Sequence, residues 1–251
     1  AQNQSYPTLD QKIRDTYAAE TDVMKRALYD AYIKAFRWST DRLDENGGII
    51  CFVSNGAWLD GNAAAGFRKS IEKEFSSIYV FNLRGNQRTS GELSRKEGGK
   101  IFGSGSRTPI SITLLVKNPE SKSDKATIFY HDIGDYLNRE DKLKIIKEFN
   151  SVSNEELKWN ILIPNSNGDW LAQRNDKFST YFEIGNKKNS ENSFFKIQSA
   201  GVMTNRETWA YNFHNKVLRD NINKLVLFYN SQVEEFKSAR TRNIELKFED
   251  F

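Results

Sequence analysis

The sequence contains few of the residues from which disulfides and metal centres are built. It has one cysteine, Cys51, and two histidines, His131 and His214, among 251 residues. A single cysteine cannot close an internal disulfide, which fits a reducing compartment. These three side chains also lack the spacing of a zinc site, so we predict no metal centre.

Long apolar runs are also absent, and we expect no secretory leader. No stretch approaches the roughly 20 apolar residues that a membrane-spanning helix needs. The opening residues have neither the basic start nor the apolar run of a secretory signal. We therefore expect a cytoplasmic protein with no membrane partner. No glycine-rich fingerprint opens a helix, so the sequence does not contain a complete dinucleotide-binding fold.

The composition is typical of a folded globular protein. Hydrophobic residues make up 38% of the chain and charged residues 28%, so a hydrophobic core can form. The length allows one large domain or two modest ones. The net charge of +4 is too small to identify a polyanionic partner on its own.

Positive charge is concentrated in residues 84–107. Six basic side chains and two acidic ones give this segment a net charge of +4, equal to that of the whole chain. Glycines recur through it, so we expect a mobile loop. Such a loop can clamp a DNA backbone, because neutralising phosphates releases counterions. A solvated loop whose charge only keeps the protein soluble is an equally open interpretation. The basic residues are Arg84, Arg88, Arg95, Lys96, Lys100 and Arg107.

Residues 1–150 alternate between helical and strand-like patterns. Residues 1–20 have few apolar side chains and predict an extended lead-in. Residues 49–53 are continuously apolar, as in a strand buried on both faces of a parallel sheet. The order of elements favours an α/β sheet with helices packed on it. We predict helices over 23–43, 62–75 and 138–149, and strands over 49–53, 77–83, 109–116 and 126–132.

The composition changes after Asn150. Residues 151–251 are richer in Asn, Lys, Glu and Phe, and they contain short strand-like pieces such as NILIP and YFEIG. A long charged helix is predicted over 216–237. We therefore place a domain boundary near Ser151, between an α/β domain over 1–150 and an α+β segment over 151–251.

Several motifs in a fixed order resemble one family of enzymes. Residues 27–32 read ALYDAY and are followed by Gly47-Gly48, a buried strand and Trp58-Leu59. Further segments are NLRGNQRTSGELSRKEGGKIFGSGSRTPISITLLVK, DWLAQRNDKF and SAGVMTNRETWAYNF. This order resembles the adenine-amino DNA methyltransferases of the gamma type. It most closely resembles the single-polypeptide, DNA-translocating type ISP restriction-modification enzymes, over nearly the whole chain.

The resemblance implies an incomplete catalytic domain. The family binds S-adenosylmethionine on a glycine-rich turn and catalyses with an Asn-Pro-Pro-Tyr motif, and both precede the counterpart of residue 1. None of the four prolines here has a proline neighbour. Residues 1–150 then correspond to the second half of a Rossmann-like, S-adenosylmethionine-dependent methyltransferase sheet. Residues 151–251 correspond to a linker and the start of the target-recognition region.

The resemblance also implies the cofactor and the partners. The cofactor is S-adenosylmethionine, and its site is expected to be incomplete in this chain. The partners are double-stranded DNA and the remainder of the same polypeptide, which includes the first half of the methyltransferase. A nuclease and a helicase motor are expected on that polypeptide, because the type ISP group carries both.

Two residues acquire roles from the resemblance, and a third is chosen for its position at the end of a strand. An adenine in a duplex must be flipped out to reach the cofactor, and the family covers one face of the flipped base with an aromatic residue that matches Phe102. Tyr32 matches an aromatic residue that packs against the cofactor's adenine. Asn55 follows a strand, where ligands gather in open α/β sheets. Alternatively, Phe102 and Tyr32 are core residues, and Asn55 simply begins a helical turn.

The predicted DNA contacts fall into two groups. The six basic residues of the segment 84–107 are the predicted phosphate contacts, which position DNA without reading its sequence. Base reading requires Arg, Asn or Gln in the major groove, and Gln173, Arg174, Asn205 and Arg206 are candidates. The predicted function is methyl transfer to the exocyclic amine of a flipped adenine within a restriction-modification enzyme. The alternative is a non-catalytic DNA-binding specificity module.

We predict that the 251 residues alone transfer no methyl group to DNA, because the glycine-rich cofactor turn and the Asn-Pro-Pro-Tyr motif are missing from them. The measurement is incorporation of labelled methyl from S-adenosylmethionine into DNA by the purified chain. Incorporation above the level seen without protein would contradict the expected incomplete site.

Overall fold

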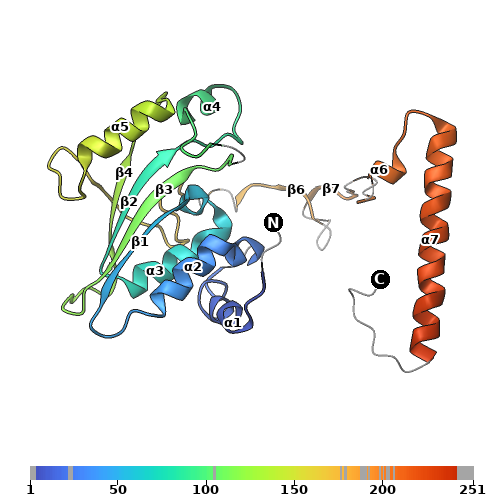
Figure 1. The fold of residues 1–251 in the computed structure, drawn as a ribbon, viewed down its shortest axis with the longest axis horizontal. Coiled ribbons are helices and arrows are strands. Elements are labelled where there is room, and N and C mark those ends of the chain that lie inside the picture. Colours follow the sequence, from blue (N-terminus) through green and yellow to red (C-terminus); the bar gives the residue numbers. More distant parts are fainter. Residues whose placement is uncertain are drawn as a thin grey trace. The chain divides into compact units, whose positions relative to one another are not determined.

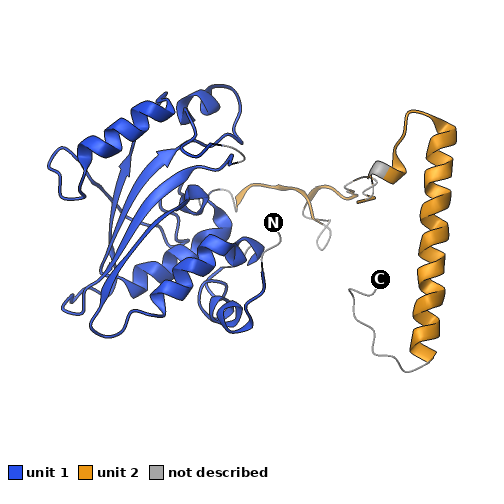
Figure 2. Ribbon diagram, in the orientation of Figure 1, with its two compact units in different colours: residues 1–179 blue, residues 180–251 orange. Residues whose placement is uncertain are grey.

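A computed structural model describes the chain as two compact units, residues 1–179 and residues 180–251 (Figure 2). Within them it describes residues 4–21, 25–103, 106–175, 177, 180–186, 191, 193–197, 199, 201, 204–205 and 207–241. Each unit is considered by itself below.

The first unit is built on a five-stranded sheet in the order β1-β3-β2-β4-β5. Strands β1 and β2 both pair antiparallel with β3, β4 pairs parallel with β2, and β5 pairs antiparallel with β4. The carboxyl ends of β1, β2 and β4 therefore meet at one edge of the sheet. The bounds are β1 Gly48–Asn55, β2 Ser77–Arg84, β3 Ile110–Lys117, β4 Thr127–Asp132 and β5 Asn160–Leu162.

Helices cover the two faces of this sheet unequally. Helices α1, α2 and α3 lie on one face, whereas α5 lies on the other, with the short α4 beside it (Figure 1). The bounds are α1 Pro7–Asp15, η1 Lys25–Tyr29, α2 Ala31–Thr40, η2 Gly56–Leu59, η3 Asn62–Ala64, α3 Ala65–Glu74, α4 Gly91–Glu97 and α5 Arg139–Phe149.

The main core lies between the sheet and helices α1 to α3. Phe36 of α2 packs on Phe52 of β1 with ring centroids 4.9 Å apart, and on Phe67 of α3 at 5.2 Å. Trp58 also packs on Phe67 and is 1% exposed. Full burial of each large apolar side chain contributes about 1.5–3 kcal/mol. A second cluster, which includes Phe81, lies on the opposite face under α5.

The α/β sheet with packed helices is confirmed, and three details of the prediction are wrong. Residues 7–15 form α1 instead of an extended lead-in, because Ile13 and the following Tyr17 are fully buried in the main core. Strand β1 is not buried on both faces. Among the described residues it is a sheet edge, and Ile49 and Val53 are 65% and 55% exposed. The expected helix over 23–43 is broken into η1 and α2.

The first unit continues past the change in composition near Ser151. Trp170 is 2% exposed, packs on Trp58 with ring centroids 5.3 Å apart, and donates from Nε1 to Glu72 at 2.6 Å. Leu157 is buried as well. Residues 151–175 therefore complete the core of the first unit, although their composition differs from that of residues 1–150.

The second unit contains little buried surface. Strands β6 Glu183–Gly185 and β7 Ser193–Phe195 form a parallel pair, followed by α6 Glu207–Ala210 and the long α7 Asn215–Thr241. The helix predicted over 216–237 is therefore confirmed. None of the α7 side chains is fully buried. Among the described residues, no helix is both long and apolar enough to cross a membrane.

Candidate nucleic-acid interface

The glycine-rich segment between β2 and β3 was expected to be a mobile loop. Residues 84–103 are instead folded against α5. Helix α4 occupies its centre. Gly98 has φ +67°, and a side chain there would meet the backbone oxygen of Leu137 at 2.1 Å. The amide of Gly99 donates to the same oxygen at 2.9 Å. The glycines therefore permit a close backbone approach, which holds the segment in place.

A buried lysine of α5 holds the backbone of this segment through hydrogen bonds. Lys142 of α5 is fully buried, and its Nζ donates to the backbone oxygens of Glu97 at 2.7 Å and Gly99 at 2.8 Å. Burial lowers the pKa of Lys142 to about 8, while the nearby charge of Glu97 opposes that shift. The ammonium satisfies carbonyls at the end of α4 that have no partner within the helix.

Arg84 has carboxylate partners within the protein. Its Nε lies 2.7 Å from Asp132 Oδ1, and its Nη1 contacts the carboxylate of Asp135. Burial disfavours the charged form of Arg84, but the bonds to these two carboxylates outweigh it and raise the pKa. Phosphate would have to compete with both, so Arg84 is better suited to holding the carboxyl ends of β2 and β4 together.

The other cations of the segment form an exposed surface. Arg88, Arg95, Lys100 and Arg107 are all exposed, and Lys96 is half-buried. Arg95 lies 3.4 Å from Glu92, and Lys96 lies 3.8 Å from Asp135, both on the surface. Exposed pairs of this kind contribute at most about 1 kcal/mol, so they leave the cations available to another anion. Arg107 also donates to the backbone oxygen of Gln87 at 3.0 Å.

Phe102 belongs to the same segment and is 50% exposed. Its neighbour Ile101 is 7% exposed within the second core cluster, and the Ile101 oxygen accepts from Arg139 Nε at 2.8 Å. The chain is thus anchored one residue before Phe102, and the ring itself is not packed into the core. The stacking role of Phe102 stays a prediction.

The two predicted cofactor residues lie on different elements, Tyr32 on α2 and Asn55 at the end of β1. Tyr32 of α2 is half-buried against the main core, and burial raises the pKa of its phenol, which stays neutral. Asn55 ends β1, and its Oδ1 accepts from the amide of Ala57 at 2.9 Å as the cap of η2. Asn55 therefore begins a helical turn, as the alternative held, and a cofactor contact remains untested for both residues.

The predicted base-reading residues fall in both units. Arg174 pairs with Asp169 at 2.8 Å, and Gln173 donates to the oxygen of Ile163 at 2.8 Å, so both have partners inside the first unit. Asn205 is exposed in the second unit with φ +50°. Arg206 lies outside the described residues. Among the residues that the structure covers, no cluster of His, Cys, Asp or Glu is placed to hold a metal.

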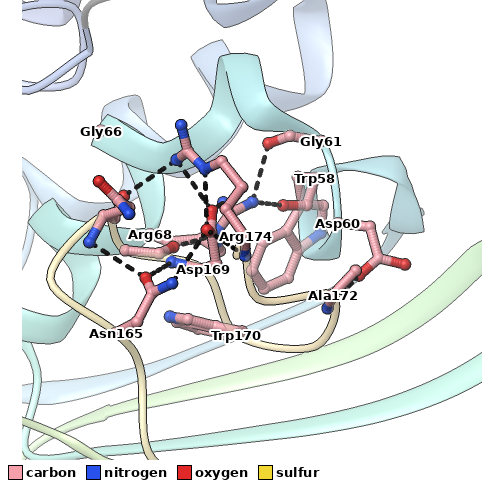
Figure 3. A network of polar contacts seen from close by, with 12 residues as sticks. Trp58, Asp60, Gly61, Gly66, Arg68, Asn165, Asp169, Trp170, Ala172 and Arg174 are labelled. Carbon is pink, nitrogen blue, oxygen red and sulfur yellow. Dashed lines mark hydrogen bonds and ion pairs between the residues drawn. The ribbon is translucent and has the colours of Figure 1, made fainter. Parts of the chain in front are cut away.

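A buried network centred on Arg68 was not predicted from the sequence (Figure 3). Arg68 of α3 is fully buried, donates from Nη1 to the oxygens of Trp58 at 2.6 Å and Gly61 at 2.9 Å, and donates from Nε to Gly168 at 2.6 Å. Its Nη2 lies 3.5 Å from Asp169. An arginine within an amphipathic helix is usually a surface residue, so its sequence position gave no signal of burial.

We predict that Lys142→Met lowers the free energy of unfolding by about 2 kcal/mol, because the carbonyl of Gly99 loses the Lys142 donor and the carbonyl of Glu97 keeps only the amide of Gly85. Amide exchange should accelerate around those residues, as measured by hydrogen exchange with mass spectrometry. Lys144→Met, on the same helix but 75% exposed at its side chain, is the control and should leave both quantities unchanged. Equal exchange in the two variants would show that Lys142 does not hold the segment.

Comparison with known proteins gives the family. Residues 193–250 match the family model of the Type ISP C-terminal specificity domain. A search of curated proteins found no match. One similar solved structure is a nuclease-deletion mutant of the Type ISP restriction-modification enzyme LlaGI in complex with a DNA substrate mimic. It is 42% identical, with a TM-score of 0.81, over 98% of this chain and 19% of that chain.

Two further solved structures are similar over most of this chain. The ATP-dependent Type ISP restriction-modification enzyme LlaBIII bound to DNA is 34% identical, with a TM-score of 0.82, over 92% of this chain and 15% of that chain. The DrdV–DNA complex is 30% identical, with a TM-score of 0.79, over 97% and 24%. This chain thus spans less than a quarter of the length of each of these proteins, and it belongs to the Type ISP restriction-modification family.

Proposed function

We propose that this chain is the part of an adenine DNA methyltransferase that presents DNA to the catalytic centre, within a restriction-modification enzyme. In this proposal residues 1–150 supply the second half of the methyltransferase sheet, and residues 151–251 lead into target recognition. The observation that carries the proposal is one segment, between β2 and β3, whose surface combines exposed cations with a half-exposed Phe102.

The cations of this surface suit a DNA backbone. Arg88, Lys100 and Arg107 are exposed, and in the part of the chain that the structure describes none of them pairs with a carboxylate. Neutralising phosphates with such cations drives non-specific DNA binding by counterion release. The solved structures of LlaGI, LlaBIII and DrdV named above are described as complexes with DNA or a DNA substrate mimic, which supports the same assignment.

Phe102 suits the face of an extruded base. Enzymes that modify a base take it out of the duplex and hold it between aromatic or apolar side chains. The ring of Phe102 is exposed while Ile101 beside it is buried, so the ring is presented from a fixed point. The neighbouring cations can hold the phosphates that flank such a base.

The exposure of the edge strand β1 supports the proposal that the sheet in this chain is incomplete. Its outward side chains Ile49 and Val53 are apolar and exposed, an arrangement that native sheets usually cover or pair. In the proposed enzyme the first half of the methyltransferase covers this strand. That half supplies the glycine-rich turn and the Asn-Pro-Pro-Tyr motif.

Tyr32 and Asn55 are also suited to contribute to a binding site for S-adenosylmethionine. S-adenosylmethionine supplies the methyl group, and the neutral, half-buried ring of Tyr32 offers an apolar surface to its adenine. The Asn55 amide lies at the carboxyl end of β1, where ligands bind in open α/β sheets. Both contacts are proposals that need the complete domain.

A non-catalytic specificity module is the second candidate. It is favoured by the match of residues 193–250 to the model of a specificity domain. The two candidates share DNA binding and differ in whether Phe102 serves the chemical step.

DNA binding by this surface predicts a specific salt dependence. Lys100→Gln with Arg107→Gln should make the slope of log K against log salt shallower by about 0.9 for each phosphate that is no longer neutralised. The measurement is fluorescence anisotropy of a labelled duplex at several salt concentrations. Lys122→Gln with Lys125→Gln removes equal charge from the exposed β3–β4 turn, at the opposite edge of the sheet, and should not change the slope. Identical slopes for the two double variants would refute the interface.

In the intact enzyme, Phe102→Ala should reduce adenine methylation about 10- to 100-fold while changing duplex affinity less than threefold, because base–aromatic stacking is worth about 1–3 kcal/mol. Methyl incorporation and duplex affinity are measured in parallel. Leu93→Ala removes another exposed apolar side chain of the same segment and serves as the control. Equal loss of methylation and binding, or no loss of either, would favour the specificity module.

A further inference from the structure

The turn between β4 and α5, residues 133–138, lies along the segment between β2 and β3. The amide of Tyr136 donates to the backbone oxygen of Lys96 at 3.1 Å. At the start of α5, Arg139 Nε donates to the backbone oxygen of Ile101 at 2.8 Å. The turn and the first residue of α5 are therefore in direct contact with the segment that carries the predicted DNA contacts.

Two side chains of this stretch, Tyr136 and Arg139, are exposed and take no part in the core. Tyr136 is 58% exposed, and the side chain of Arg139 is 52% exposed. The sequence alone indicated neither residue. Besides its bond to Ile101, Arg139 lies 3.9 Å from Glu140 on the surface. Exposed contacts of this kind contribute little to stability, so the guanidinium is available to another anion.

Tyr136 has a backbone conformation that tyrosine rarely adopts. Its φ is +62°, in the left-handed region, where a Cβ atom is disfavoured and glycine is not. Its hydroxyl donates to Glu92 Oε1 at 2.6 Å, a bond between exposed groups that contributes only modestly to stability. The two effects are small and opposite in sign, so glycine would suit the turn equally well. A strained residue that presents an exposed ring is a candidate for function.

Cations of α4 lie close to the Tyr136 ring. Arg95 Nε lies 3.4 Å from Glu92 Oε2, so the arginine and the phenol share one carboxylate. Lys96 Nζ lies 3.8 Å from the carboxylate of Asp135, the residue before Tyr136. Both acidic groups beside the ring are thus paired with cations of the protein. An exposed aromatic ring with cations nearby is the arrangement by which proteins bind unpaired DNA, because bases stack on the ring and phosphates contact the cations.

We propose that the β4–α5 turn is a second DNA-contacting element, in which Tyr136 stacks on an unpaired base and Arg139 contacts a phosphate of the same strand. The inference rests on the proposed function, which brings DNA to the neighbouring segment. It adds an unpaired strand as a partner, because extruding one base on to Phe102 leaves the opposite base without its pair. A tyrosine ring suits that base whatever its identity, since every base has a face on which to stack.

The test measures binding of a fluorescently labelled single-stranded oligodeoxythymidine to the full chain by anisotropy. Tyr136→Gly removes the ring but keeps the turn, because glycine adopts a positive φ freely. This variant should bind the single strand about tenfold more weakly, through the loss of one stacked base. Tyr136→Phe keeps the ring and loses only the bond to Glu92, so its affinity should stay within about threefold of the unaltered chain. Unchanged affinity of the glycine variant would overturn the proposal.

Matched controls separate each contact from a general effect. Trp38→Ala removes a ring of α2 that is 50% exposed, and it should bind the single strand like the unaltered chain. Arg139→Gln should make the slope of log K against log salt shallower by about 0.7, the value for one phosphate of a single strand. Lys144→Gln, at an exposed position further along α5, should leave the slope unchanged. A Tyr136→Phe variant as weak as Tyr136→Gly would overturn the stacking role, and equal slopes for the Arg139 and Lys144 variants would overturn the phosphate contact.

Failure of this proposal and failure of the proposed function give different results. Duplex binding that depends on Lys100 and Arg107, together with single-strand affinity that Tyr136→Gly does not change, would refute the second element and leave the first interface standing. Weaker single-strand binding by Tyr136→Gly, with a duplex slope that does not depend on Lys100 and Arg107, would support the second element and contradict the phosphate contacts of the proposed function. Absence of single-strand binding by the unaltered chain would also overturn the proposal.

Discussion

The guanidinium of Arg68 is the interaction on which much of the first unit depends. It joins the turn after β1 to a segment 100 residues further along the chain, because it binds the oxygens of Trp58, Gly61 and Gly168 and faces Asp169. Bonds from Arg174 lower the pKa of Asp169 below its usual range despite the cost of burial, so this carboxylate stays charged. Removing one partner of a buried pair typically costs about 3–5 kcal/mol, because the other charge is left uncompensated. The turn after β1 and the end of the first unit are therefore fixed together.

A second buried cation, Lys142, fixes backbone segments in the same way on the opposite face of the sheet. It binds two carbonyls at the end of α4 and thereby shapes the segment that carries the exposed cations and Phe102. The two buried cations bind mainly backbone oxygens, whereas the exposed ones face solvent. Charge is thus used in two ways at one edge of the sheet: inside, to fix loop geometry, and outside, to attract a polyanion.

Family membership and local chemistry answer different questions about this protein. Similarity to LlaGI and LlaBIII over more than 90% of the chain gives the Type ISP family, but the chain spans less than a fifth of each of those two proteins. Methyl transfer, the cofactor and the flipped base therefore rest on the arrangement of particular side chains. The exposed Phe102 and the exposed cations of the same segment carry that argument, because each has a chemistry that a packed core residue does not need.

The sequence by itself determined the elements whose causes are local. The apolar runs at 77–83 and 110–116 gave strands, and Asn138 caps α5 through a bond to Asp141 at 2.9 Å, since a cap needs only neighbours along the chain. The family also followed from the order of motifs. Only the tertiary structure decided that Arg84 is paired with Asp132 and Asp135, that Lys142 and Arg68 are buried, and that the glycines of 84–103 pack on α5. Those outcomes depend on partners about 40 to 100 residues away, and no periodicity or composition along the chain encodes which distant groups will meet.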